Sequence, residues 1–221
     1  MEPVAVTAIL IIIAGILAIK ISKRKSMYPL LPKRYNFGKR RDTLKKVLEM
    51  LDAREAKVLL ETGISREGLK NTKGDGASTI LFGIWAKQHQ AKLYSVDIDP
   101  KAVSVANKQI DAMDLTDYVF THVSDSVAYL KLFDQQVGFL YLDSYDYDKR
   151  DKSIQKMSQL HHLNEFKAIE SRLKDNCVVL IDDCNLPGGG KGKTVIEYML
   201  KRNWEIVMQE YQVILQKSSI E

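Results

Sequence analysis

The stretch from Val58 to Asp99 constrains the fold of this chain more than any other part of the sequence. An apolar run ends in Glu-Thr-Gly at 61–63, a glycine-containing turn follows at 74–79, and an apolar helical run leads to the acid-terminated segment 92–99. A strand that ends in an acid and a glycine, a turn into a helix and a second strand that ends in acids make a nucleoside-binding β-α-β unit. The glycines let the backbone approach a ligand, and a carboxylate after the second strand can hold a ribose diol.

Strands and helices alternate along the rest of the chain. The hydrophobic patterns predict strands at 57–62, 92–97, 118–123, 137–143 and 177–182, and helices at 42–54, 77–89, 100–112, 126–133, 158–174 and 193–202. Two further strands, Trp204–Met208 and Tyr211–Gln216, are expected to form a hairpin. This order predicts an α/β fold: a Rossmann-like, seven-stranded, mostly parallel sheet with helices on both faces and a C-terminal antiparallel hairpin.

The acids at the strand ends favour one kind of nucleoside over another. Ligands of such sheets bind beyond the carboxyl ends of the strands, where Glu61, Asp97, Asp143 and the pair Asp182-Asp183 are expected. A dinucleotide site needs Gly-x-Gly-x-x-Gly, but the next glycine after Gly63 is Gly68, and Glu61 would stand beside a pyrophosphate. An NAD-dependent oxidoreductase is therefore the weaker alternative. S-Adenosylmethionine carries a sulfonium and an ammonium group, which carboxylates suit better.

The glycine motifs resemble those of a known enzyme superfamily. Glu61-Thr-Gly63 and Gly76-Ala-Ser78 are similar to the two halves of the Glu-x-Gly-x-x-x-Gly-x-Ser loop of class I S-adenosylmethionine-dependent methyltransferases. Within that superfamily the chain is most similar to small-molecule and sugar O-methyltransferases of the catechol O-methyltransferase type, over about residues 42–217. Twelve residues separate Gly63 from Gly76 where three are usual, which implies an inserted loop of about nine residues, Ser65–Lys73.

The resemblance implies roles for single residues around S-adenosylmethionine. Asp97 would hold the ribose, Asp125 the adenine amine and Ser78 the methionine carboxylate. The full set of implied cofactor-binding residues is Glu61, Gly63, Gly76, Ser78, Asp97, Asp125 and Asp143. Asp99, just before Pro100, is expected to cap a helix instead.

The resemblance also implies a possible Mg²⁺ site. In metal-dependent members the ligands are an acid after the fourth strand and an Asp-Asn pair after the fifth, which Asp143, Asp183 and Asn185 would supply. Cys184 stands where the Asn is expected, and Asp146 stands where the catechol enzymes carry a lysine. The general base is therefore open between a metal-bound substrate and the side chains of Asp146, Tyr145 and His162, and Asp143, Asp146, Asp183 and His162 are the candidate catalytic residues.

These departures leave two functions open, an O-methyltransferase and a catalytically inactive binding or scaffold protein of the same fold. The loop Gly188–Thr194 resembles a phosphate-binding loop, but Pro187 occupies the position of its first glycine, so ATP binding is rejected. The loop is expected to be a lid or a plain connection, in which Lys191 or Lys193 either contacts an anionic acceptor or is solvated.

The amino terminus has a different character from the body. Pro3–Ile19 is uncharged and Lys20, Lys23, Arg24 and Lys25 follow it, which predicts a transmembrane anchor over 1–22, a basic juxtamembrane linker over 23–41 and a methyltransferase-like domain over 42–221. The positive charges place the body in the cytoplasm, as a single-pass membrane protein. Residues 47–221 carry 22 basic and 26 acidic side chains, so no nucleic-acid partner is expected. The expected acceptor is a small molecule, a sugar or a lipid-linked molecule.

Overall fold

The computed structural model describes residues 13–15 and 25–218. Within them the chain forms a seven-stranded sheet in the order β3-β2-β1-β4-β5-β7-β6. The strands are β1 (Val58–Thr62), β2 (Lys92–Asp97), β3 (Val119–Val123), β4 (Val137–Leu142), β5 (Leu173–Ile181), β6 (Trp204–Gln209) and β7 (Val213–Lys217). Strands β1 to β5 are parallel, while β7 pairs antiparallel with both β5 and β6. The predicted sheet and its C-terminal hairpin are confirmed.

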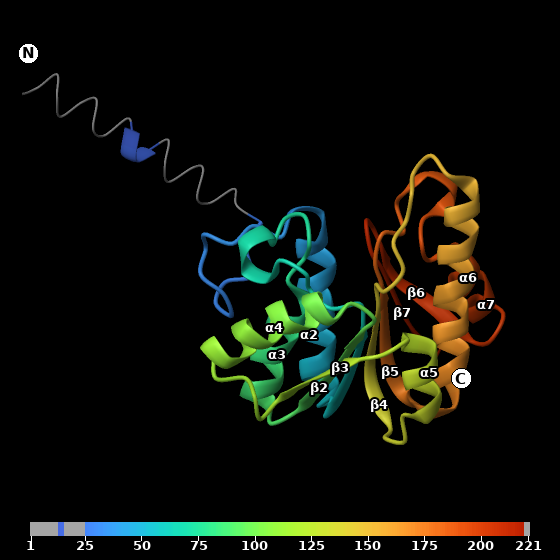
Figure 1. Cartoon of the computed structure of the whole chain (residues 1–221), viewed down its shortest axis with the longest axis horizontal. Coiled ribbons are helices and arrows are strands. Elements are labelled where there is room, and N and C mark those ends of the chain that lie inside the picture. The colour runs from blue at the N-terminus through green and yellow to red at the C-terminus, as the bar shows by residue number, and fades with distance from the viewer. Residues whose placement is uncertain (1–12, 16–24, 219–221) are drawn as a thin grey trace, which may run out of the picture.

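Helices cover both faces of the sheet. They are α2 (Arg41–Arg54), α3 (Ser78–His89), α4 (Pro100–Ala112), α5 (Ser126–Leu132), α6 (Lys152–Ile169) and α7 (Lys193–Leu200), with short 3₁₀ turns η1 (Gly38–Arg40), η2 (Gly68–Asn71), η3 (Glu170–Arg172) and η4 (Pro187–Gly189). Figure 1 shows α2, α3 and α4 on one side of the sheet and α5, α6 and α7 on the other. Strand β4 is buried along its whole length, as its unbroken apolar sequence requires in a parallel sheet covered on both faces.

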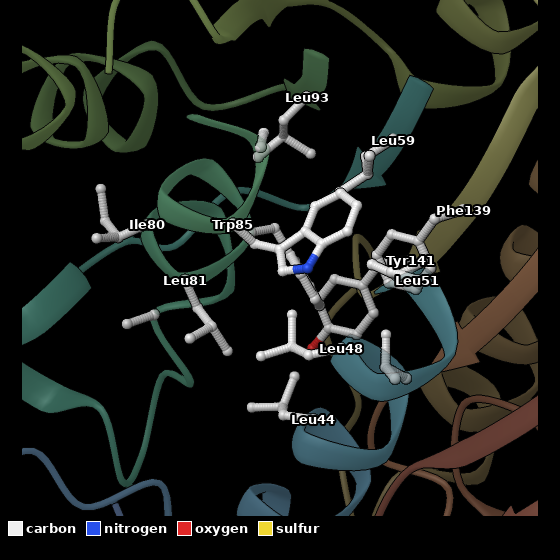
Figure 2. Close-up of a cluster of buried hydrophobic side chains, with 14 of the residues drawn as sticks. Leu44, Leu48, Leu51, Leu59, Ile80, Leu81, Trp85, Leu93, Phe139 and Tyr141 are labelled. Atoms are coloured by element: carbon white, nitrogen blue, oxygen red, sulfur yellow. The ribbon is translucent and has the colours of Figure 1, made fainter. Parts of the chain in front are cut away.

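The larger core lies under α2 and α3. Figure 2 shows Trp85 of α3 surrounded by leucines of α2 and by the aromatic side chains of β4. Phe139 packs against Phe82 with ring centroids 4.7 Å apart, and Tyr141 lies 5.8 Å from the same ring. Trp85 Nε1 donates a hydrogen bond of 2.6 Å to Asp52, so its polar edge is satisfied at the rim of the core.

The strand order places a ligand cleft. Strands β1 and β4 are neighbours in the sheet, but the chain continues from β1 toward β2 on one side and from β4 toward β5 on the other. Beyond their first residues, the loops after β1 and β4 therefore diverge and leave a cleft between them. Gly63, which follows β1, has φ +82°, and a Cβ there would lie 2.4 Å from the carbonyl oxygen of Asp143. Only glycine lets these two loops approach so closely.

The structure differs from the sequence prediction around α6 and β5. Helix α6 begins at Lys152, where Asp151 accepts hydrogen bonds from the backbone of Ser153 and Ile154. The first turns of this helix are largely exposed, so no apolar periodicity marked them. The helix predicted over 158–174 ends earlier, at Ile169, and β5 starts at Leu173 instead of residue 177. Residues 174–176 of β5 are exposed, so no continuous apolar run indicated that they belong to the strand.

The predicted basic linker is part of the folded body from residue 25 onward. Met27, Leu31 and Phe37 are buried, with exposed fractions of 5%, 1% and 0%, and belong to the same core as Trp85. The boundary placed at residue 42 is therefore too late. The sequence did not indicate this packing, because the apolar side chains between the basic residues are spaced without helical or strand periodicity.

The segment predicted to cross a membrane, Pro3–Ile19, lies outside the described residues except for 13–15. In the described part of the chain, no helix combines the length and the apolar character that a membrane crossing requires.

Replacement of Phe139 by alanine tests the core. The ring is fully buried between α3 and the sheet, so we expect Phe139→Ala to lower the free energy of unfolding by about 3–5 kcal/mol. Leu132→Ala is the matched control, since Leu132 is 85% exposed and its loss should change stability by less than about 0.5 kcal/mol. Urea unfolding followed by circular dichroism measures both, and equal effects would contradict this description of the core.

Candidate active site

Two adjoining pockets lie beyond the carboxyl ends of the central strands. The large pocket has a volume of about 660 Å³ and is lined by residues that follow β2, β3 and β4, among them Asp97, Asp125 and Tyr145. The small pocket, of about 160 Å³, lies over the loops that follow β1, β4 and β5. Arg66, Asp97 and Asp146 line both pockets, so the two form one continuous cleft.

The acids of the large pocket are fixed by backbone amides. Asp97 Oδ2 accepts a hydrogen bond of 2.9 Å from the amide of Ile64, and its Oδ1 accepts one of 2.8 Å from Asp99. Asp125 caps α5 by accepting from the amide of Ala128, at 2.8 Å. Asp99 caps α4 by accepting from the amide of Lys101, as predicted, although it also reaches the large pocket. Two of the predicted cofactor-binding residues, Asp97 and Asp125, thus line the same pocket, and backbone amides hold both of their carboxylates.

Glu61 lies beneath the cleft and does not line it. Its side chain is fully buried and accepts hydrogen bonds from the hydroxyls of Ser78, Thr79 and Ser95, at 2.5, 2.7 and 2.6 Å. These bonds join the end of β1 to the start of α3 and to β2. Burial raises the pKa of Glu61 to about 7, against the opposing effect of the three hydroxyls. The structure therefore gives Glu61 a positioning role in place of the predicted contact with a ligand.

Two other predicted cofactor-binding residues, Gly63 and Ser78, line the small pocket. Gly76 does not line it, and an added Cβ there would lie 3.2 Å from Cδ of Arg40, so this glycine makes room for the arginine stem.

A compact charge cluster forms the floor of the small pocket. The Lys191 ammonium lies 2.6 Å from Asp143 Oδ1 and 3.4 Å from Asp183 Oδ2. The Arg40 guanidinium lies 2.7 Å from Asp182 Oδ2 and 3.4 Å from Asp183 Oδ1. Both cations are nearly buried, with side chains that are 5% and 9% exposed. Three carboxyl groups therefore share two cations.

This geometry sets the protonation of the cluster. Burial alone would lower the pKa of Lys191, but the carboxylates of Asp143 and Asp183 outweigh it and raise that pKa above its ordinary value. Burial raises the pKa of Asp143, and Asp182 and Asp183 add to this, while Lys191 acts against it. Burial would also raise the pKa of Asp182, but Arg40 and Lys191 hold it below its usual range. Lys191 stays an ammonium ion, and Asp143 has a greater affinity for a proton than Asp182.

The residues predicted to bind Mg²⁺ do not fit a divalent cation. Asp143 and Asp183 do come together, but the Lys191 ammonium already bridges them, and the Tyr211 hydroxyl donates to Asp183. Asn185 is exposed and does not line the small pocket. The described residues contain no group of three or more His, Cys, Asp and Glu side chains placed to hold a metal ion. The expectation of a magnesium site is thus corrected, because the protein's own cation occupies the position between the carboxylates.

The other candidate bases are placed less favourably. His162 is fully buried in α6, its Nδ1 lies 2.7 Å from the Ser158 carbonyl oxygen, and burial lowers its pKa to about 4. It lines neither pocket. Asp146 does line both, but its side chain is 74% exposed and pairs with Arg66 at 2.8 Å. Tyr145 lies in the large pocket.

The inserted loop Ser65–Lys73 folds over the cleft. Asp75 Oδ2 accepts hydrogen bonds from the Ser65 hydroxyl and from the amides of Glu67 and Gly68, at 2.5, 2.9 and 3.2 Å. Arg66 extends from this loop to Asp146, across the boundary of the two pockets. The insertion therefore supplies one wall of the cleft.

Sequence reasoning missed Arg40 entirely and left Lys191 undecided. Arg40 belongs to the segment taken for a linker, and it is 142 residues from its partner Asp182. Lys191 was one of two lysines in a glycine-rich loop. The available signal was the excess of acids at the strand ends, which requires buried cations somewhere in the chain.

Residues 73–184 match the family model described as a methyltransferase domain, which is half of the chain and runs from the end of the insertion to the loop after β5. The chain belongs to this methyltransferase family. The resemblance to the class I S-adenosylmethionine-dependent methyltransferase superfamily is thereby confirmed. A comparison with curated proteins gives no significant sequence match.

Solved methyltransferase structures share the fold. A Podospora anserina methyltransferase bound to SAH aligns with a TM-score of 0.59 at 12% identity, over 81% of this chain and 79% of its own. An O-methyltransferase of Bacillus cereus in complex with SAH aligns with a TM-score of 0.56 at 13% identity, over 91% and 88%. A methyltransferase of Geobacter sulfurreducens aligns with a TM-score of 0.56 at 14% identity, over 85% and 83%. At these identities the likeness concerns the fold.

The buried Glu61 predicts a pH-dependent stability. Its pKa in the folded protein lies near 7, above the ordinary 4.5, so its contribution to stability is complete below pH 4.5 and is lost as the pH rises through about 7. We expect this loss to reach about 3 kcal/mol in the free energy of unfolding. Glu61→Gln keeps the shape and removes the titration, so its stability curve should be flatter over this range. Urea unfolding between pH 4.5 and 8 measures the difference, in which other titrating groups cancel, and parallel curves for the two proteins would refute the assignment.

Proposed function

We propose that this methyltransferase transfers a methyl group from S-adenosylmethionine to a hydroxyl of a small-molecule, sugar or lipid-linked acceptor. The observation that carries the proposal is the charge of the small pocket, which is lined by five aspartates and three basic residues. A net negative pocket stabilises the sulfonium and ammonium groups of this cofactor, and it would repel the pyrophosphate of a dinucleotide. The membership of the methyltransferase family supports the same choice.

The two pockets divide the cofactor between them. The large pocket has the volume for adenosine, with Asp97 at the ribose and Asp125 at the adenine amine. Gly63 and Ser78, which line the small pocket, would hold the methionine part, and Asp143 in the same lining would face its positive charge. Arg66 and Asp146 lie over the junction. This division uses carboxylates that backbone amides already hold in place, so little ordering is needed on binding.

When bound, S-adenosylmethionine supplies an activated methyl group, whose bond to sulfur breaks as the acceptor oxygen attacks in line. The chain's own residues position the acceptor and take its proton. Asp143 serves as the general base, since burial raises its pKa and it lines the small pocket. Lys191 holds Asp143 at 2.6 Å and stabilises negative charge that develops on the acceptor oxygen. When Asp143 takes up the proton, Lys191 keeps Asp183 as a partner.

Cofactor binding is the first test of the proposal. Calorimetry of the full chain in non-ionic detergent should show saturable binding of S-adenosylmethionine. No binding at millimolar cofactor would overturn the proposal.

Asp143→Asn separates an enzyme from an inactive scaffold. Loss of a general base should lower methyl transfer by about 10²–10⁴-fold and leave the dissociation constant of S-adenosylmethionine within a few-fold of the unmodified chain. The assay follows labelled methyl from the cofactor into soluble and membrane extracts. Asp134→Asn is the control, because Asp134 is exposed and lines neither pocket of the cleft. Cofactor binding without any transfer by the unmodified chain would favour the inactive scaffold.

We further propose that the amino-terminal segment anchors the enzyme in a membrane with the catalytic domain facing the cytoplasm. Support comes from the uncharged run Pro3–Ile19 and from the bases that follow it. An anchored enzyme would meet a lipid-linked acceptor without a search through bulk solution.

A charge within the apolar run tests the anchor. Arginine near the middle of a transmembrane helix costs about 2.5–3.5 kcal/mol, so Ile11→Arg should lower the fraction of the chain that resists alkaline extraction from membranes. Ile21→Arg, which lies beyond the run among the existing bases, should leave that fraction unchanged. Retention of Ile11→Arg at the level of the unmodified chain would contradict the anchor.

A further inference from the structure

A third pocket adjoins the small pocket of the cleft at Arg40 and Gly74. This basic pocket has a volume of about 460 Å³ and is lined by Lys25, Asn36, Gly38, Lys39, Arg40, Lys73, Gly74 and Tyr211. Arg40 and Gly74 also line the small pocket, so the basic pocket opens next to the proposed site of methyl transfer. Nothing in the methyl-transfer chemistry described above uses its lysines.

The basic pocket lies where the inserted loop contacts residues 25–40, the basic segment before α2. The Thr72 hydroxyl donates to the Asn36 carbonyl oxygen at 2.9 Å, and Arg40 Nη1 donates to the Gly74 carbonyl oxygen at 2.9 Å. A Cβ on Gly38 would lie 3.1 Å from Cγ of Lys73, so these chain segments are in close contact. In Figure 1 the blue segment after residue 25 and the teal 3₁₀ turn η2 lie in the same part of the molecule. The insertion and the basic segment before α2 thus form one pocket together, in addition to their contacts with the cleft.

The charge of this pocket is opposite to that of the cleft. Four of its lining residues are basic and none is acidic. Arg40 and Lys25 have carboxylate partners in Asp182 and Asp42. Among the residues that the structure describes, Lys39 and Lys73 form no salt bridge, and the Lys39 ammonium lies 5.1 Å from the centre of the Tyr211 ring. The pocket therefore presents two uncompensated positive charges beside a buried guanidinium.

We propose that the basic pocket binds a phosphate or pyrophosphate group of the acceptor, so that the methylated molecule is an anion. This inference rests on the proposed methyl transfer and names the class of its substrate. Two lysines and an arginine around one cavity suit a group with several charged oxygens. The anionic group in the basic pocket would place the rest of the acceptor over Arg40, toward Asp143. The cofactor and the acceptor then bind in different places because of their charges: S-adenosylmethionine binds in the acidic cleft, and the phosphate group of the acceptor binds in the basic pocket.

Inorganic pyrophosphate is the probe for this site. Calorimetry on the full chain in non-ionic detergent should show binding that weakens as salt is raised. The double variant Lys39→Ala/Lys73→Ala should bind pyrophosphate about tenfold or more weakly, because two charge-assisted contacts are lost. Lys101→Ala/Lys108→Ala is the matched control: it removes two exposed lysines from α4, outside the basic pocket, and should bind within about twofold of the unmodified chain.

The affinity for S-adenosylmethionine, measured on the same variants, separates this inference from the proposed function. We expect Lys39→Ala/Lys73→Ala to keep it. A parallel loss of cofactor affinity would assign the basic pocket to the methionine carboxylate and overturn the inference. A chain that binds S-adenosylmethionine but not pyrophosphate would overturn the inference alone. A chain that binds pyrophosphate through these lysines but not S-adenosylmethionine would overturn the methyltransferase proposal and retain an anion site.

The product of methyl transfer identifies the source of the phosphate. Labelled methyl recovered in an organic extract of membranes, and retained by an anion exchanger, would indicate a lipid-linked phosphate. Label retained by the exchanger from the aqueous phase would indicate a soluble phosphate ester. Label in a product that passes the exchanger unbound would overturn the inference.

Discussion

Two buried cations hold the ends of β4 and β5 together. Arg40 and Lys191 face Asp143, Asp182 and Asp183, whose carboxylates would repel one another strongly if they were left unpaired in a largely buried site. Each cation arrives from a separate segment, one from η1 before α2 and one from the loop before α7. These ion pairs therefore hold η1 and the glycine-rich loop against the carboxyl edge of the sheet. It also determines the chemistry available there, because the ammonium between Asp143 and Asp183 takes the place that a metal ion would need.

A second network supports the same edge from below. Glu61 accepts three hydroxyl hydrogen bonds that join β1, β2 and the start of α3, and Gly63 lets the next loop touch the loop after β4. Gly63 and Ser78 also line the small pocket, whereas Glu61, Thr79 and Ser95 line neither pocket of the cleft. These three buried side chains hold the loops whose residues line the cleft, so the placement of Asp97 and Ser78 depends on them.

Much of this arrangement could be read from the sequence, and the rest could not, for physical reasons. The bounds of β2 and α4 were predicted to the residue, since apolar periodicity and the Asp99-Pro100 start are local signals. The first turns of α6 were missed because exposed polar helices lack such periodicity. Mg²⁺ was expected because carboxylates at two strand ends have the right chemistry, and the sequence does not state which cation lies between them. The burial of Phe37 was not predicted either, because the apolar residues of this basic segment show no helical or strand periodicity.

The sequence by itself determined the order of strands and helices, the methyltransferase resemblance and the concentration of acids at one edge of the sheet. Those features depend on neighbours along the chain or on strand ends that every parallel sheet brings to one edge. The tertiary structure decided which charges neutralise those acids, and it joined the insertion to the amino-terminal segment around a basic pocket. Arg40 and Asp182 are 142 residues apart, and contacts over such separations are set by packing of the whole domain, which no local pattern records.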